Sequence, residues 1–79
     1  MPTVHRERGF DFFFYSEERN EPPHIHVASG GGYAKMWLSP RVAVAYSYEF
    51  SPRERRTVVE IVTRERAMME KAWHDHFGT

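Results

Sequence analysis

The fold is decided by residues 21–38, which read EPPHIHVASGGGYAKMWL. A strand that begins at His24, after the two prolines, has side chains that alternate between its two faces. His24 and His26 therefore point from the same face, about 7 Å apart. The glycines at 30–32 predict a tight turn, and Tyr33–Leu38 predicts the returning strand of a hairpin.

The same hairpin predicts which residues face each other. A two-residue turn at Gly30-Gly31 and a four-residue loop at 29–32 give the same register. The facing pairs are Val27 with Ala34, Ile25 with Met36, His26 with Lys35, and His24 with Trp37. One face of the hairpin is therefore apolar, and the other gathers two imidazoles, an ammonium group and an indole.

Strands are also predicted on both sides of this hairpin. The aromatic run Phe10–Tyr15 follows a turn at Gly9 and pairs with a short first strand at Thr3–Arg6. The segment 42–48 follows a connection at 39–41 and forms the last strand. Simple pairing puts the side chains of residues 42 and 44 on the apolar face.

That pairing has a consequence for the histidine side of the sheet. Ala43 and Ala45 would lie there and leave a shallow groove beside Lys35 and Trp37. A bulge near Pro40 would invert this parity.

A helix is predicted after Phe50. Ser51 is an N-cap, Pro52 suits the first helical position, and Glu54 completes a capping box. Apolar residues then recur at helical spacing, with Arg66 breaking the pattern and Gly78 as a stop signal. The stripe consists of Val59, Val62, Met69, Trp73 and Phe77. The prediction is a single α+β domain over residues 1–79, with a largely antiparallel four- or five-stranded sheet and one long C-terminal helix packed on one face.

Composition narrows the class of protein. The 79 residues are 41% apolar, which suits one small folded domain. The eleven basic residues are balanced by eleven acidic ones, an argument against a simple nucleic-acid binder. There is no cysteine for a disulfide or thiolate site, no secretion signal, and no apolar run approaching the roughly 20 residues of a membrane span. A cytoplasmic protein with no membrane partner is the expectation.

Several segments together resemble one family. The resemblance lies in residues 20–27, 34–38, 50–54 and 72–77, which read NEPPHIHV, AKMWL, FSPRE and AWHDHF, and in the opening FFFYS of residues 12–16. On these motifs the chain resembles the small bacterial proteins classed as the domain of unknown function DUF4160. The resemblance implies a bacterial, cytoplasmic protein, often encoded beside another small uncharacterised protein and proposed to act in toxin–antitoxin pairs. The sequence departs from the pattern at Glu49, where a glycine is expected before Phe50.

One hypothesis for the histidine face is metal-independent RNA cleavage by a toxin-like protein. One imidazole of the pair His24 and His26 would take a 2′-hydroxyl proton and the other would protonate the leaving oxygen, while Lys35 stabilises the phosphorane. Trp37 or Tyr33 would stack a base. A metal site closed by Glu18 or Glu21 is disfavoured, because Lys35 would repel the cation. No metal and no cofactor are therefore predicted.

The alternative hypothesis is a non-catalytic binding module. His24 and His26 would then form hydrogen bonds with the loop at residues 18–21, and Trp37 would cover them within a protein interface. The sheet face would dock a small antitoxin-like companion protein or a second copy of the chain. In either hypothesis Trp37, Tyr33 and Glu21 are the candidate residues for binding the substrate or partner.

Overall fold

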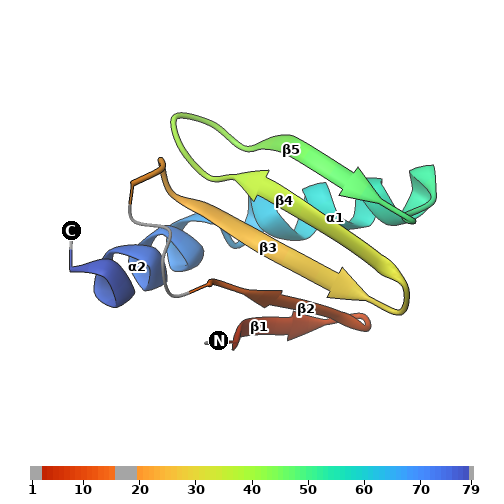
Figure 1. Cartoon of the computed structure of the whole chain (residues 1–79), viewed down its shortest axis with the longest axis horizontal. Coiled ribbons are helices and arrows are strands. Elements are labelled where there is room, and N and C mark those ends of the chain that lie inside the picture. Colours follow the sequence, from red (N-terminus) through yellow and green to blue (C-terminus); the bar gives the residue numbers. More distant parts are fainter. Residues whose placement is uncertain (1–2, 16–19, 79) are drawn as a thin grey trace.

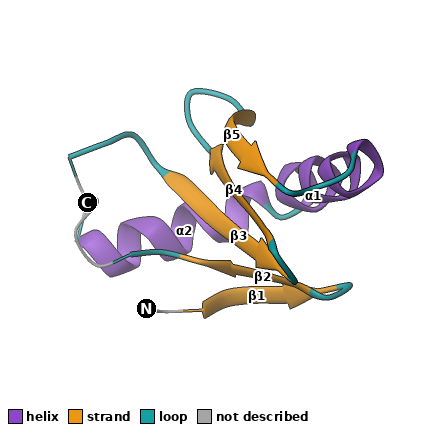
Figure 2. Cartoon of the chain, turned by 45° about the vertical axis from the view of Figure 1, so that its right-hand side comes forward, coloured by secondary structure: helices purple, strands orange, loops and turns teal. Residues whose placement is uncertain are grey.

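The computed structural model describes residues 3–15 and 20–78 as one antiparallel sheet with helices on one of its faces (Figures 1 and 2). The strands are β1 (Thr3–Glu7), β2 (Phe10–Phe13), β3 (His24–Ser29), β4 (Gly32–Trp37) and β5 (Ala43–Tyr48), in that spatial order. The helices are α1 (Pro52–Arg64) and α2 (Arg66–Phe77). The predicted α+β fold class is confirmed. Within the described residues no helix is long and apolar enough to cross a membrane.

The central hairpin has the predicted register. β3 and β4 pair antiparallel with His24 opposite Trp37 and His26 opposite Lys35, and Gly30 and Gly31 form the turn. Gly30 has a φ of 56°, as a tight hairpin turn requires. The first hairpin is similar: Arg8 and Gly9, both with positive φ, join β1 to β2. The alternation of residues in 24–38 therefore does determine the two faces of the sheet.

The last strand departs from simple pairing. Lys35 pairs with Tyr46, but the next residue of β4, Met36, pairs with Val44, so Ala45 is the extra residue of a bulge. Before the bulge the prediction is correct, since Val44 lies opposite Met36 on the helix side. After it the parity is switched, and Tyr46 and Tyr48 point to the histidine side. The predicted shallow groove is therefore only half correct. Ala43 lies opposite Trp37, and both line a pocket of about 310 Å³. Tyr46 rather than Ala45 lies opposite Lys35, so the groove does not extend there.

The C-terminal segment is two consecutive helices rather than one. The capping box at Ser51 and Glu54 is present, and Gly78 ends α2 with a left-handed φ of 70°. The break is at Glu65, although backbone bonds from Glu65 to Ile61 and from Met69 to Glu65 continue across it. Next to the break, the Arg66 side chain donates to the carbonyl of Pro40 at 2.9 Å. Arg66, which interrupts the predicted apolar stripe, thus attaches the helices to the loop before β5.

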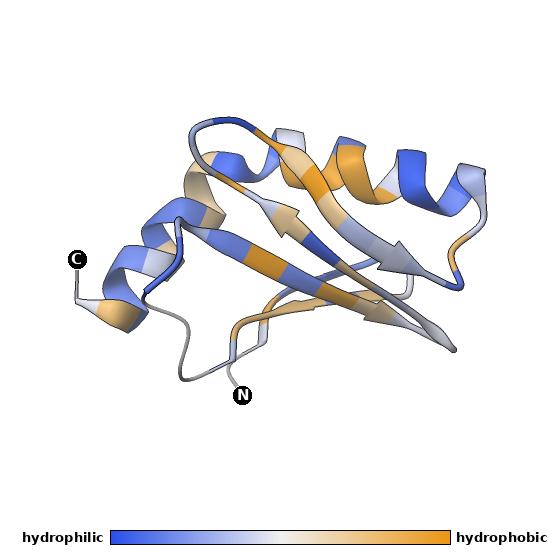
Figure 3. Cartoon of the chain, turned by 45° about the horizontal axis from the view of Figure 1, so that its top comes forward, coloured by the Kyte–Doolittle hydropathy of each residue, from blue (hydrophilic) through white to orange (hydrophobic). Residues whose placement is uncertain are grey.

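The core lies between the sheet and the two helices. β2, β3 and β4 each contribute the side chains of one of their faces to this core. The helices contribute apolar residues, which alternate with polar ones along α1 (Figure 3). On α1 the buried residues are Val58, Ile61 and Val62, so Val59 of the predicted stripe is only half-buried. On α2 they are Met69 and Trp73, as predicted. The helices cover one face of the sheet and leave the other open.

Candidate binding face

The face of the sheet opposite the helices carries most of the predicted site residues. We call it the open face and define it by Phe13, Tyr15, His24, His26, Tyr33, Lys35, Trp37, Tyr46 and Tyr48. Across residues 3–15 and 20–78, α2 borders this face at His24, and no helix or strand covers the rest of it (Figure 1). The prediction that one face gathers the histidines, Lys35 and Trp37 is consistent with this register.

His24 is fully buried at the start of β3. Its Nδ1 lies 3.0 Å from the backbone oxygen of Pro22. Because a carbonyl oxygen can only accept, Nδ1 carries a proton and donates it to this bond. The ring also contacts Trp73 of α2 and Trp37 of β4, with centroids 4.7 and 5.6 Å away. His24 therefore holds the proline turn against both the sheet and the C-terminal helix.

His26 lies beneath a layer of aromatic rings. It is only 2% exposed, and its ring is stacked with those of Phe13 and Tyr33, each 5.7 Å away between centroids. The centroid of a third ring, that of Tyr15, lies 4.5 Å from the imidazole centroid in an edge-to-face arrangement. The Tyr33 hydroxyl lies 2.6 Å from Nδ1 of His26, which is hydrogen-bonding distance. The imidazole is thus a buried part of the layer that supports Tyr33.

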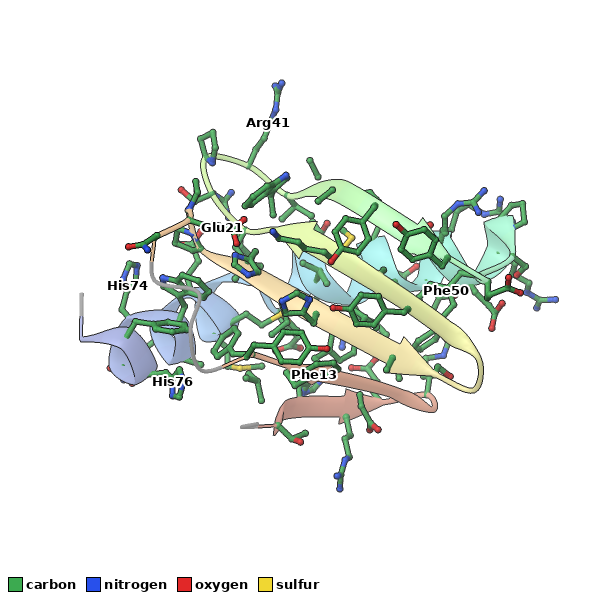
Figure 4. The ribbon with its side chains drawn as sticks, viewed as in Figure 1. Phe13, Glu21, Arg41, Phe50, His74 and His76 are labelled. Atoms are coloured by element: carbon green, nitrogen blue, oxygen red, sulfur yellow. The ribbon has the colours of Figure 1, made fainter. Side chains whose placement is uncertain are left out.

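Lys35 is neutralised by an acidic residue from the loop before β3. Its ammonium group donates to a carboxylate oxygen of Glu21 at 2.5 Å and lies 4.5 Å from the centre of the Trp37 ring. Lys35 is 9% exposed, and Figure 4 shows Glu21 beside the start of β3. Glu21 therefore fixes the position of Lys35, and the cation is shared with an indole ring.

The exposed part of the open face is made of tyrosines. Tyr33, Tyr46 and Tyr48 form a row across β4 and β5, with neighbouring ring centroids 6.0 and 5.5 Å apart. We call it the tyrosine row. Tyr46 is 37% and Tyr48 61% exposed. Burial raises the pKa of the Tyr33 phenol well above its usual range, and hydrogen bonds with Tyr15 and Tyr46 raise it further. Sequence reasoning missed Tyr46 and Tyr48 as residues of this face. They reach it because the strand has a bulge at Ala45, whereas we considered a bulge only near Pro40.

Potential metal ligands cluster at a different place. Within the described residues, the side chains of His5, Glu7 and Glu65 bring three ligand atoms within 4.8 Å of one another. The Arg64 guanidinium forms ion pairs with both glutamates, so a cation already lies at this cluster. Glu18, which the metal hypothesis invoked, lies outside the described residues. Glu21, the other residue invoked, forms an ion pair with Lys35.

The fold and its open face define a class: a small α+β domain with a five-stranded antiparallel meander, helices on one face and an aromatic, partly polar surface on the other. The family model for the domain of unknown function DUF4160 matches residues 9–74, and the chain belongs to this family. The resemblance of the sequence motifs is thereby confirmed. No curated protein and no solved structure matches the chain.

Proposed function

We propose that the protein is a non-catalytic binding module that docks a small companion protein through its open face, as one member of a bacterial toxin–antitoxin-type pair. One observation carries the proposal: the open face exposes tyrosines while it buries its two histidines. We expect the pair to act in the cytoplasm, as the family resemblance implies.

The chemistry of the exposed residues suits an interface. Tyrosine and tryptophan offer large contact areas at low conformational cost, and they are enriched among residues that dominate binding energies. Here the rings of Tyr46 and Tyr48 are held by contacts with each other and with Tyr33. Trp37, half-buried at the end of β4, extends the same surface. Since these rings are already ordered, a partner would pay little to immobilise them.

The burial of the histidines favours binding over RNA cleavage. A general acid or base must reach the proton that it moves, directly or through one water. His24 is 0% and His26 2% exposed, and the ammonium of Lys35 is already paired with Glu21. A ribonuclease reaction at this pair would require the aromatic layer over His26 to open first.

The test is to co-express the chain with the small companion protein that the family resemblance implies is encoded beside it, and to measure their co-purification and affinity. We expect the Tyr46→Ala, Tyr48→Ala double variant to lose binding by at least about 100-fold, since exposed aromatic anchors dominate such interfaces. Lys71→Ala, a change at an exposed residue of α2, is the matched control and should bind normally. Unchanged binding by the double tyrosine variant would reject the open face as the docking site.

A second arm of the experiment addresses the enzyme hypothesis. The parent chain is induced alone in a bacterial host, and growth and cellular RNA are followed. The binding module predicts intact RNA. RNA breakdown that stops in a folded His24→Gln, His26→Gln variant would instead favour a ribonuclease.

A further inference from the structure

A groove lies outside the open face, between β5 and the outer side of α1. Its volume is about 620 Å³, and it is lined by Val44, Pro52, Arg55, Arg56, Val59 and Glu60. Val44 is 44% exposed although it is an apolar residue, and Val59 is half-buried. β5 is the last strand of the sheet, so one long side of this strand is also unpaired among the described residues. An apolar groove at a sheet edge is a common kind of interaction surface.

The charges beside the groove are arranged so that the surface complements itself. Arg56 and Glu60 are four residues apart and therefore lie on the same side of α1, with Val59 between them. Both side chains are exposed, and neither forms an ion pair with any residue in the described part of the chain. Arg55 differs, since its guanidinium donates to the backbone oxygen of Phe50 at 3.0 Å.

A two-fold axis near the middle of this surface would bring two α1 helices together in opposite directions. Arg56 of each copy would then face Glu60 of the other, and Val44 and Val59 of both copies would meet at the centre. A two-fold interface needs this self-complementary pattern, in which residue i contacts j and j contacts i. A domain of this size buries a modest share of its surface alone, so added apolar contact is favourable.

We propose that this groove is the interface of a homodimer in which two copies of the chain pack through α1 and the edge of β5. The bulge at Ala45 twists the β5 edge. The contact is therefore made by side chains of the groove rather than by a continuous sheet. The inference does not rest on the proposed function, because the open face stays uncovered in such a dimer.

The experiment is sedimentation equilibrium of the full chain from micromolar to near-millimolar concentration. The parent should reach the mass of a dimer. Arg56→Glu or Glu60→Arg alone replaces two attractive pairs with two repulsive ones, so each should weaken dimerisation by about tenfold or more. The double variant Arg56→Glu, Glu60→Arg restores both pairs with the charges exchanged, and dimerisation should recover. Arg41→Glu makes the same charge change on the β4–β5 loop and serves as the control.

A second measurement uses the absence of cysteine from the sequence. Val59→Cys would introduce one thiol near the two-fold axis, and mild oxidation should yield a covalent dimer. Ala67→Cys, at an exposed residue of α2, should not. A parent that stays monomeric overturns the proposal. So does a dimer that is insensitive to both charge reversals and forms no Val59→Cys cross-link, since it must use another surface.

Discussion

The two faces of the sheet are built from the same strands but exclude water in different ways. The helix-covered face is apolar, and α1 and α2 bury Phe12, Ile25 and Val27 completely. On the open face of the described structure, α2 contributes Trp73 beside His24, and no helix covers His26 or Lys35, yet all three polar residues are buried. They are covered by neighbouring aromatic rings and by Glu21. A single layer of tyrosine, phenylalanine and tryptophan can thus hide polar groups while remaining available to a partner.

The largest difference between the faces should be in stability. Trp73 is 2% exposed and contacts Phe14, His24 and Phe77. Trp73→Ala should lower the free energy of unfolding by about 3–5 kcal/mol, through lost burial and a cavity. Tyr48→Ala, at the exposed end of the tyrosine row, should change it by less than about 0.5 kcal/mol.

Equilibrium denaturation of both variants by urea measures the two values. A loss for Tyr48→Ala that approaches the loss for Trp73→Ala would mean that the tyrosine row is a second core. The helix-covered face would then not be the main source of stability.

Substitutions of His26 test how much the buried polar groups of the open face stabilise the fold. His26→Ala should cost about 2–3 kcal/mol, because the stacked ring is removed and the Tyr33 hydroxyl loses its partner. His26→Phe keeps a ring between Phe13 and Tyr33, so it isolates the polar contact and should cost about 1 kcal/mol. If both variants are as stable as the parent, the imidazole is retained for a reason other than structure, and catalysis becomes the better explanation.

Much of this architecture could be predicted from local patterns. The alternation in residues 24–38, with glycines at the turn, determines register because a shift of one residue would reverse every side chain. Ser51 and Glu54 define a helix start through contacts only three residues apart. These features are local, so the sequence alone was sufficient for them.

Other features depend on contacts between distant segments. The bulge at Ala45 adds one residue and has no composition signal, yet it decides which side of the sheet Tyr46 and Tyr48 occupy. The complete burial of His24 requires Trp73 from the last helix. The pairing of Lys35 with Glu21 requires the proline turn to bring the loop back over β4. Spacing could therefore predict which residues share the open face, but it could not predict their exposure.

The stability that the open face contributes should depend on pH through Tyr33. Its folded-state pKa is raised above the ordinary value of 10.0, first by burial and then by hydrogen bonds with Tyr15 and Tyr46. A group with a raised folded pKa contributes stability that is fully present below the unfolded value and is lost as pH rises above it. The parent should therefore lose stability above about pH 10 more steeply than Tyr33→Phe does.

Thermal unfolding of both chains between pH 8 and pH 11, in about unit steps, measures this difference. The absorbance of tyrosinate gives an independent check, since the ionisation missing from Tyr33→Phe should lie above the usual tyrosine range. Parallel stability curves would show that Tyr33 is as solvated as the tip of the row.

The smallest expected effect is at Glu49, in the turn between β5 and α1. Glu49 has a φ of 60°, a left-handed conformation that costs a residue with a side chain about 1–2 kcal/mol. It is also the position at which the family pattern leads us to expect glycine. Glu49→Gly should raise the free energy of unfolding by about 0.5–1 kcal/mol, since part of the relieved strain is offset by the entropy of glycine in the unfolded chain. Glu49→Ala removes the same carboxylate but keeps the Cβ, so it should give no such gain. If alanine stabilises the protein as much as glycine does, the charge of Glu49 rather than its backbone conformation is the unfavourable feature of this turn.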